Sequence, residues 1–127
     1  MRLSLIPTIA LAFGLAACET TAPMTEEASS ATRLATQADM AAITGKMLTL
    51  EPGKSYVIGA AGTIQGTWDG GPLVGQYEMK DGYFCRTLSQ GPSGPAPEDC
   101  QILLLDGDTL RGTRDRGNGA SFALIVS

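Results

Sequence analysis

This chain of 127 residues contains three cysteines, Cys18, Cys85 and Cys100, and no histidine. The cysteines are therefore the residues best suited to covalent or metal chemistry. Without histidine, the Ser-His-Asp and Cys-His arrangements of nucleophilic catalysis and the common zinc-enzyme sites are excluded. The sequence has no Ser-x-x-Lys motif, and Phe122 stands where a G-x-G-x-x-G nucleotide loop beginning at Gly117 would need its last glycine. We therefore expect neither an enzyme nor a cofactor.

Cys18 ends a segment typical of a signal peptide. Residues 1–17 carry one positive charge, at Arg2, followed by an apolar run too short to span a bilayer as a permanent helix. The four residues Leu-Ala-Ala-Cys that end at Cys18 resemble the lipobox of bacterial lipoproteins. This resemblance implies a diacylglyceryl thioether on Cys18, cleavage before it, and acylation of the new amino group with palmitate or a similar chain. An ordinary thiol after a plain signal peptide is the alternative.

Glu19 follows the predicted lipid anchor. Lipoproteins retained in the inner membrane of many Gram-negative bacteria carry Asp at this position, so we expect the outer membrane, facing the periplasm. Loss of Arg2 with the signal peptide would leave eight basic against thirteen acidic residues, a net charge of −5. Such a charge repels nucleic acid and anionic lipid headgroups, so neither is expected as a ligand.

Cys85 and Cys100 are expected to form a disulfide. Export would place them in a compartment that oxidises thiols, and the assignment of Cys18 to lipid leaves these two to pair. A metal site is the alternative. Zinc takes four protein ligands, or three plus water, and no histidine is present to complete such a set.

The disulfide also predicts a strand register. If the two cysteines lie opposite each other in antiparallel strands, Arg86 lies opposite Asp99, and Tyr83 lies opposite Ile102. The first pair would join opposite charges across the strands, and the second would join an aromatic and an aliphatic side chain.

Two kinds of side chain are candidates for binding. Trp68 and Tyr77 fit either large core residues with polar atoms at the rim or the wall of a wet aromatic cleft. The arginines fit either a surface site for an anion or protein partner, or scattered solubilising charges. The carboxylates sit mainly at turns, where we expect them to be solvated. The arginines concerned are Arg86, Arg111, Arg114 and Arg116.

The elements that position these residues begin after a linker. Residues 18–35 have almost no large apolar side chain, which predicts a flexible spacer, and residues 36–127 are predicted to form one small β domain. A short helix is expected over about 36–44, started by a capping box between Thr36 and Asp39. Its apolar stripe would consist of Met40, Ile43 and Met47, with Gly45 as the terminator.

From Lys46 onward, short β-type runs alternate with turn dipeptides, which indicates an antiparallel all-β meander of about eight strands. Such a meander closes into a small barrel or folds over as a sandwich, and both remain open. The segment from Gln90 to Glu98 contains three prolines and is predicted as the one long loop. The expected strands are 46–50, 55–60, 63–69, 73–80, 83–89, 100–106, 109–114 and 120–126.

Alternation assigns the faces of these strands. One row should contain the residues Ile64, Gly66, Trp68, Leu73, Gly75, Tyr77 and Met79, and it should continue through Leu110, Gly112, Phe122, Leu124 and Val126. The glycines in this row would leave room for bulky neighbours or mark bends of the sheet.

The runs Gly62–Trp68 and Asp-Gly-Tyr-Phe-Cys-Arg at 81–86, followed by Asp-Cys-Gln at 99–101, resemble small secreted or lipid-anchored proteins of α-proteobacteria. The resemblance covers residues 45–126. It implies no established activity, although some members carry the name dihydrodipicolinate reductase. The missing dinucleotide motif, the small domain and the expected export disfavour a reductase using NADPH.

These observations favour a lipid-anchored envelope protein that acts as a non-catalytic binding or interaction module. Its partner would be an envelope protein or glycan. The alternative is a periplasmic inhibitor of lysozyme or a protease, which would use the loop from Gln90 to Glu98, and this rests on analogy with other small disulfide-bearing barrels.

Overall fold

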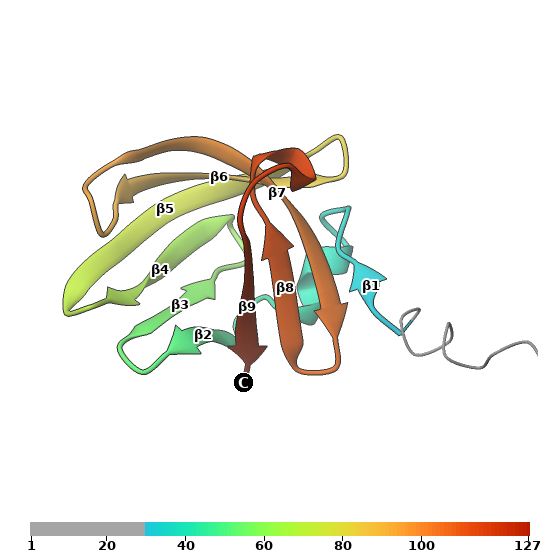
Figure 1. The fold of residues 1–127 in the computed structure, drawn as a ribbon, viewed down its shortest axis with the longest axis horizontal. Coiled ribbons are helices and arrows are strands. Elements are labelled where there is room, and N and C mark those ends of the chain that lie inside the picture. Colours follow the sequence, from blue (N-terminus) through green and yellow to red (C-terminus); the bar gives the residue numbers. More distant parts are fainter. Residues whose placement is uncertain (1–29) are drawn as a thin grey trace, which may run out of the picture.

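The computed structural model describes residues 30–127, so the predicted signal peptide, Cys18 and most of the predicted linker lie outside the described residues. These residues form an antiparallel barrel of eight strands with one extra strand, β1 (Figure 1). Within the same range, no helix is long and apolar enough to cross a membrane. The elements are β1 (Thr32–Arg33), η1 (Asp39–Ala42), β2 (Met47–Glu51), β3 (Lys54–Ile58), β4 (Thr63–Trp68), β5 (Gly71–Lys80), β6 (Tyr83–Gln90), β7 (Ala96–Asp106), β8 (Thr109–Thr113), η2 (Asp115–Gly117) and β9 (Ser121–Val126).

The barrel closes because β2 and β9, the two ends of the meander, pair with each other. Leu48 lies opposite Val126, and each strand from β2 to β9 also pairs with the next one along the chain. The sheet is therefore an up-and-down barrel, not a sandwich. The extra strand β1 pairs with β7 outside this cycle, with Thr32 opposite Leu105.

The two ends of the barrel differ. In an up-and-down barrel, successive turns lie at alternate ends, so the β2–β3, β4–β5, β6–β7 and β8–β9 connections share one end. Figure 1 shows β1 and the short η1 helix away from the β4–β5 and β6–β7 turns. Met40 and Ile43 from this segment are fully buried in the core, together with Leu34. We call this the closed end, and the other the open end.

The predicted helix over 36–44 is wrong in length and type, because only a four-residue 3₁₀ helix forms. Its predicted capping interaction is present, since Asp39 N donates to Thr36 Oγ1 at 3.2 Å and Thr36 N donates to Asp39 Oδ2 at 3.0 Å. Three residues per 3₁₀ turn suffice to bring both Met40 and Ile43 onto the core. Met47 does not join this stripe: it is exposed because it begins β2, where alternation turns Leu48 inward instead.

Two predicted boundaries also change. β1 and the buried Leu34 lie within the range 18–35 assigned to the linker, so the folded unit begins earlier, through pairing with β7 and burial of one leucine. The predicted long loop from Gln90 to Glu98 shortens to Gly91–Pro95, because β7 begins at Ala96. A register shift opposite Thr87 accommodates Pro97, since proline cannot donate to a regular ladder.

The predicted interior row is confirmed, and its glycines have a steric reason. Ile64, Leu110 and Leu124 are about 1% exposed. Gly112 lies opposite Phe122, and a Cβ at Gly112 would collide with the Phe122 ring. This row therefore packs because its glycines leave space for aromatic neighbours.

Candidate functional site

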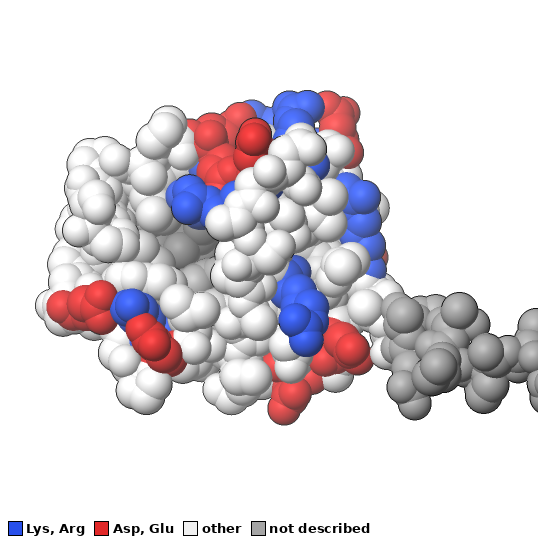
Figure 2. Space-filling view, in the orientation of Figure 1, with Lys and Arg blue, Asp and Glu red and all other residues white. Residues whose placement is uncertain are grey.

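The open end of the barrel contains a cavity of about 440 Å³. Its walls are mainly apolar, and Ile64, Phe84 and Leu124 belong both to its lining and to the hydrophobic core below it. The connection Pro92–Pro95 and residues 120–121 contribute to its rim. In the space-filling view this face of the molecule is hollowed, with basic and acidic side chains beside the hollow (Figure 2). The cavity has the size of a small-molecule site.

Arg86 brings a positive charge to the cavity wall. It lies opposite Asp99 in the β6–β7 ladder, as the disulfide register predicted. The side chains of Arg86 and Asp99 are only 17% and 14% exposed, so this pair belongs to the interior and not to the predicted surface site. Alternation explains the position, because Arg86 lies two residues from the buried Phe84 on the same face of β6.

Asp99 is the centre of the polar network beside the cavity. Its Oδ2 accepts hydrogen bonds from Gln101 Nε2 at 2.8 Å and Arg114 Nε at 2.9 Å, and its Oδ1 accepts one from the backbone N of Asp115 at 3.0 Å. Arg86 Nη2 lies further away, 3.7 Å from Oδ2. Burial raises the pKa of Asp99, but these hydrogen bonds outweigh it and hold the pKa below its ordinary value.

The guanidinium of Arg86 is incompletely paired. Its Nη1 is buried and has no hydrogen-bond partner among the residues that the structure describes. Burial lowers the pKa of Arg86, and the charge of Asp99 opposes this shift. An arginine nevertheless keeps its charge at ordinary pH.

Tyr56 also lines the cavity, on the strand next to the one that carries Trp68. Burial raises the pKa of its hydroxyl to about 12, although the charge of Arg86 lowers it in part. The phenol is therefore neutral at ordinary pH and available as a hydrogen-bond donor. Sequence reasoning missed Tyr56. The sequence carries a signal for it, because Tyr56 lies two residues from the buried Ile58 and so faces the same side of β3. Gly66 on β4 lies directly opposite Tyr56.

The two predicted aromatic candidates lie in different parts of the barrel. Trp68 lines the cavity and is half-buried, with Lys54 Nζ 6.0 Å from the centre of its ring. Tyr77 is a core residue of the closed end: its ring stacks on Phe84 at 4.8 Å, and its hydroxyl accepts a hydrogen bond from Gln37 Nε2 at 3.0 Å. Only Trp68 fits the hypothesis of an aromatic cleft.

Of the predicted arginines, two line the cavity and two do not. Arg86 and Arg114 meet at Asp99 and both line the cavity. Arg111 is exposed on β8 and does not line it. Arg116 does not line the cavity either: its Cζ lies 5.4 Å from the centre of the Tyr83 ring.

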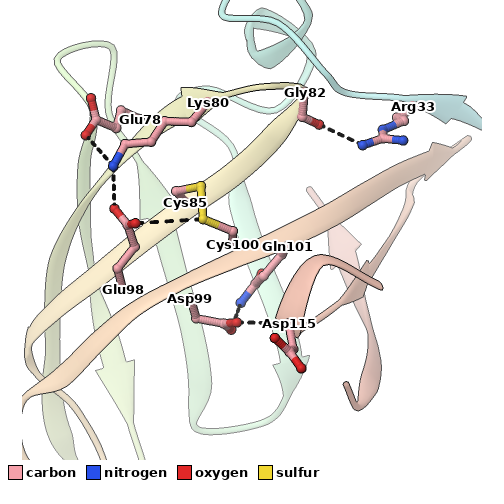
Figure 3. The surroundings of a disulfide bond; sticks show 10 residues. All are labelled: Arg33, Glu78, Lys80, Gly82, Cys85, Glu98, Asp99, Cys100, Gln101 and Asp115. Carbon is pink, nitrogen blue, oxygen red and sulfur yellow. Dashed lines mark hydrogen bonds and ion pairs between the residues drawn. A yellow bond between two sulfur atoms is a disulfide. The ribbon is translucent and has the colours of Figure 1, made fainter. Parts of the chain in front are cut away.

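The predicted disulfide between Cys85 and Cys100 is present, on the other face of the β6–β7 pair from Asp99 (Figure 3). Lys80 lies beside it, with Nζ 3.2 Å from Glu78 Oε1 and 2.7 Å from Glu98 Oε2. Glu98 and the two sulfurs lie close enough to hold a metal, but sulfurs bonded to each other are not thiolate ligands. The expected pair of Tyr83 with Ile102 is not part of the ladder, whose pairs begin at Phe84 and Gln101.

Comparison with family models, with curated proteins and with solved structures gives no match.

Proposed function

We propose that this protein is a non-catalytic binding module of the cell envelope, anchored through lipid on Cys18 and binding a small ligand at the open end of its barrel. The observation that carries the proposal is the cavity of about 440 Å³. Side chains just fill the interior of many eight-stranded barrels, whereas others of that size keep room for one small ligand. The present barrel has the features of the second kind.

The chemistry of the lining supports binding. Apolar walls with a few polar groups at fixed positions are typical of small-molecule sites. Here the polar groups include Arg86, Tyr56 and Gln101. Because they stand on paired strands of a closed barrel, they are held in place before any ligand arrives, which reduces the entropy lost on binding.

A neutral fluorescent amphiphile, N-phenyl-1-naphthylamine, tests this site. The titrations use the full chain with Cys18→Ser, so that no acyl chain on that residue competes for the dye. We expect saturable binding with an increase in dye fluorescence. Ala120→Phe should abolish it, because Ala120 lines the cavity and the added ring would occupy the rim.

Ala123→Phe is the matched control. Ala123 is exposed on β9 and lies opposite the exposed Arg111, so the same substitution there adds a ring outside the cavity. It should leave the dye affinity unchanged. Equal dye binding by both variants, or no dye binding by the parent chain, would overturn the proposed binding site.

The anchor is tested separately. Cells expressing the wild-type chain and labelled with radioactive palmitate should yield a labelled protein in the outer-membrane fraction, and Cys18→Ser should remove the label. A wild-type protein that stays unlabelled would refute the anchor without affecting the cavity.

A further inference from the structure

The wall of the cavity carries one positive charge more than its carboxylate can balance. The guanidinium groups of Arg86 and Arg114 both face Asp99, and all three side chains belong to one network. Asp99 makes its short contacts with Gln101, Arg114 and the backbone of Asp115, which leaves Arg86 at 3.7 Å. The chain as a whole is acidic, so this local excess of positive charge is distinctive.

The Arg86 side chain also has an unused donor. Nη1 is buried without a partner among residues 30–127, and buried N–H groups in folded proteins are nearly always hydrogen-bonded. An unmet charged donor is costly, and an acceptor brought by a ligand would remove that cost. Tyr56 lines the same cavity, and its neutral phenol is a second hydrogen-bond donor there.

The surroundings of this charge are apolar. Leu73, Leu88 and Phe122 line the same cavity as Arg86, and Trp68 lines it as well. A small hydrophilic anion would satisfy the guanidinium but would leave these walls without contacts. A neutral apolar compound would contact these walls but would leave the guanidinium without an acceptor.

We propose that the cavity binds an amphipathic carboxylate, whose head group accepts a hydrogen bond from the Arg86 guanidinium and whose apolar body lies against Leu73, Leu88 and Phe122. This inference rests on the proposed function, because it names the class of ligand for the same site. A carboxylate suits the head group because guanidinium–carboxylate hydrogen bonds are charge-assisted and stronger than neutral ones.

Three amphiphiles with the same chain and different head groups test the inference: dodecanoate, dodecanol and dodecyltrimethylammonium, each kept below its micelle-forming concentration. Trp68 is the single tryptophan of the chain and lines the cavity, so its fluorescence reports binding directly. We expect dodecanoate to bind at least about tenfold more tightly than dodecanol, as one charge-assisted hydrogen bond implies. Dodecyltrimethylammonium should bind most weakly.

Arg86→Gln should reduce the preference for dodecanoate over dodecanol to near unity. Arg86→Lys keeps the charge and should keep part of the preference. Arg111→Gln is the matched control, since it removes the same charge from an exposed residue outside the cavity, and it should behave like the parent chain. Thermal melting of each variant verifies that it is folded.

The outcomes separate the two proposals. Equal affinities of the parent chain for dodecanoate and dodecanol would overturn the carboxylate inference and leave the binding module standing, as would saturable binding of the naphthylamine dye with no binding of dodecanoate. A preference that persists in Arg86→Gln would also overturn it. Failure of the dye itself to bind would overturn the proposed function, and this inference with it.

Discussion

Asp99 lies directly opposite Arg86 in the β6–β7 ladder, yet its carboxylate is closer to Arg114, which comes from the connection after β8. The Oδ2 atom of Asp99 is 2.9 Å from Arg114 Nε and 3.7 Å from Arg86 Nη2. One carboxylate thus ties the β8–β9 connection to the barrel wall and leaves Arg86 partly unpaired. Both the stability of the open end and the carboxylate preference proposed for its cavity depend on this arrangement.

Asp99→Asn should destabilise the protein by about 2 kcal/mol, because it removes the one carboxylate that both Arg86 and Arg114 face in a largely buried setting. Urea unfolding followed by circular dichroism measures the change. Asp108→Asn is the control, since Asp108 is an exposed turn residue, and its unfolding midpoint should stay close to that of the wild type. Equal midpoints for both variants would refute the structural role of Asp99.

Acid should selectively remove the contribution of Asp99. Its pKa in the folded protein is lower than in the unfolded chain, so its contribution to stability is complete above the unfolded value of about 3.9 and is lost as the pH falls through the folded value. The difference in unfolding free energy between wild type and Asp99→Asn should therefore be constant near pH 6 and shrink below about pH 4. A difference that grows on acidification would contradict this assignment.

Gly66→Ala should destabilise the barrel by about 1–3 kcal/mol, because the new methyl group would collide with the backbone of Ser55 and Tyr56 on the neighbouring strand β3. Gly71→Ala is the matched control. Its Cβ would meet its nearest atom at 3.6 Å, an ordinary contact, and its backbone does not need the left-handed region. Thermal unfolding of the two variants compares them, and a similar loss in both would argue against the steric explanation.

The double substitution Cys85→Ala with Cys100→Ala should cost about 3 kcal/mol, as expected for a crosslink that closes a loop of this length. The barrel should still form, since its ladders do not depend on the sulfurs. Urea unfolding with and without a reductant checks this. The reductant should lower the stability of the wild type toward that of the double variant and leave the double variant unchanged; a wild type that is insensitive to reduction would contradict the expected contribution.

The strands could be predicted because their signals are local. Short glycine-containing turns and the one proline-rich segment between β6 and β7 separate the eight barrel strands, and the two cysteines set the register that places Arg86 opposite Asp99. Closure could not be predicted, because it depends on the pairing of Leu48 with Val126, two residues far apart in the chain. Nothing in either strand taken alone distinguishes a barrel partner from a sandwich edge.

The site was harder to predict than the fold. Charged residues are usually exposed, which favours a surface position for Arg86. Alternation along β6 favours the interior instead, because Arg86 lies two residues from each of the buried Phe84 and Leu88. The sequence leaves Tyr77 either in the core or in an aromatic cleft, and its contact with Gln37 places it at the closed end. That contact comes from a segment expected to be helical, and no local pattern shows which end of the barrel such a segment covers.

The most direct test of the open-end site is a nitrogen-15 NMR titration of the full Cys18→Ser chain with dodecanoate. We predict saturable shifts of the Trp68 indole N–H and of the Leu88 and Ala120 amides, with the buried closed-end residues Met40 and Ile43 unchanged. Shifts confined to the outer face around Ala123, or no shifts at all, would contradict it.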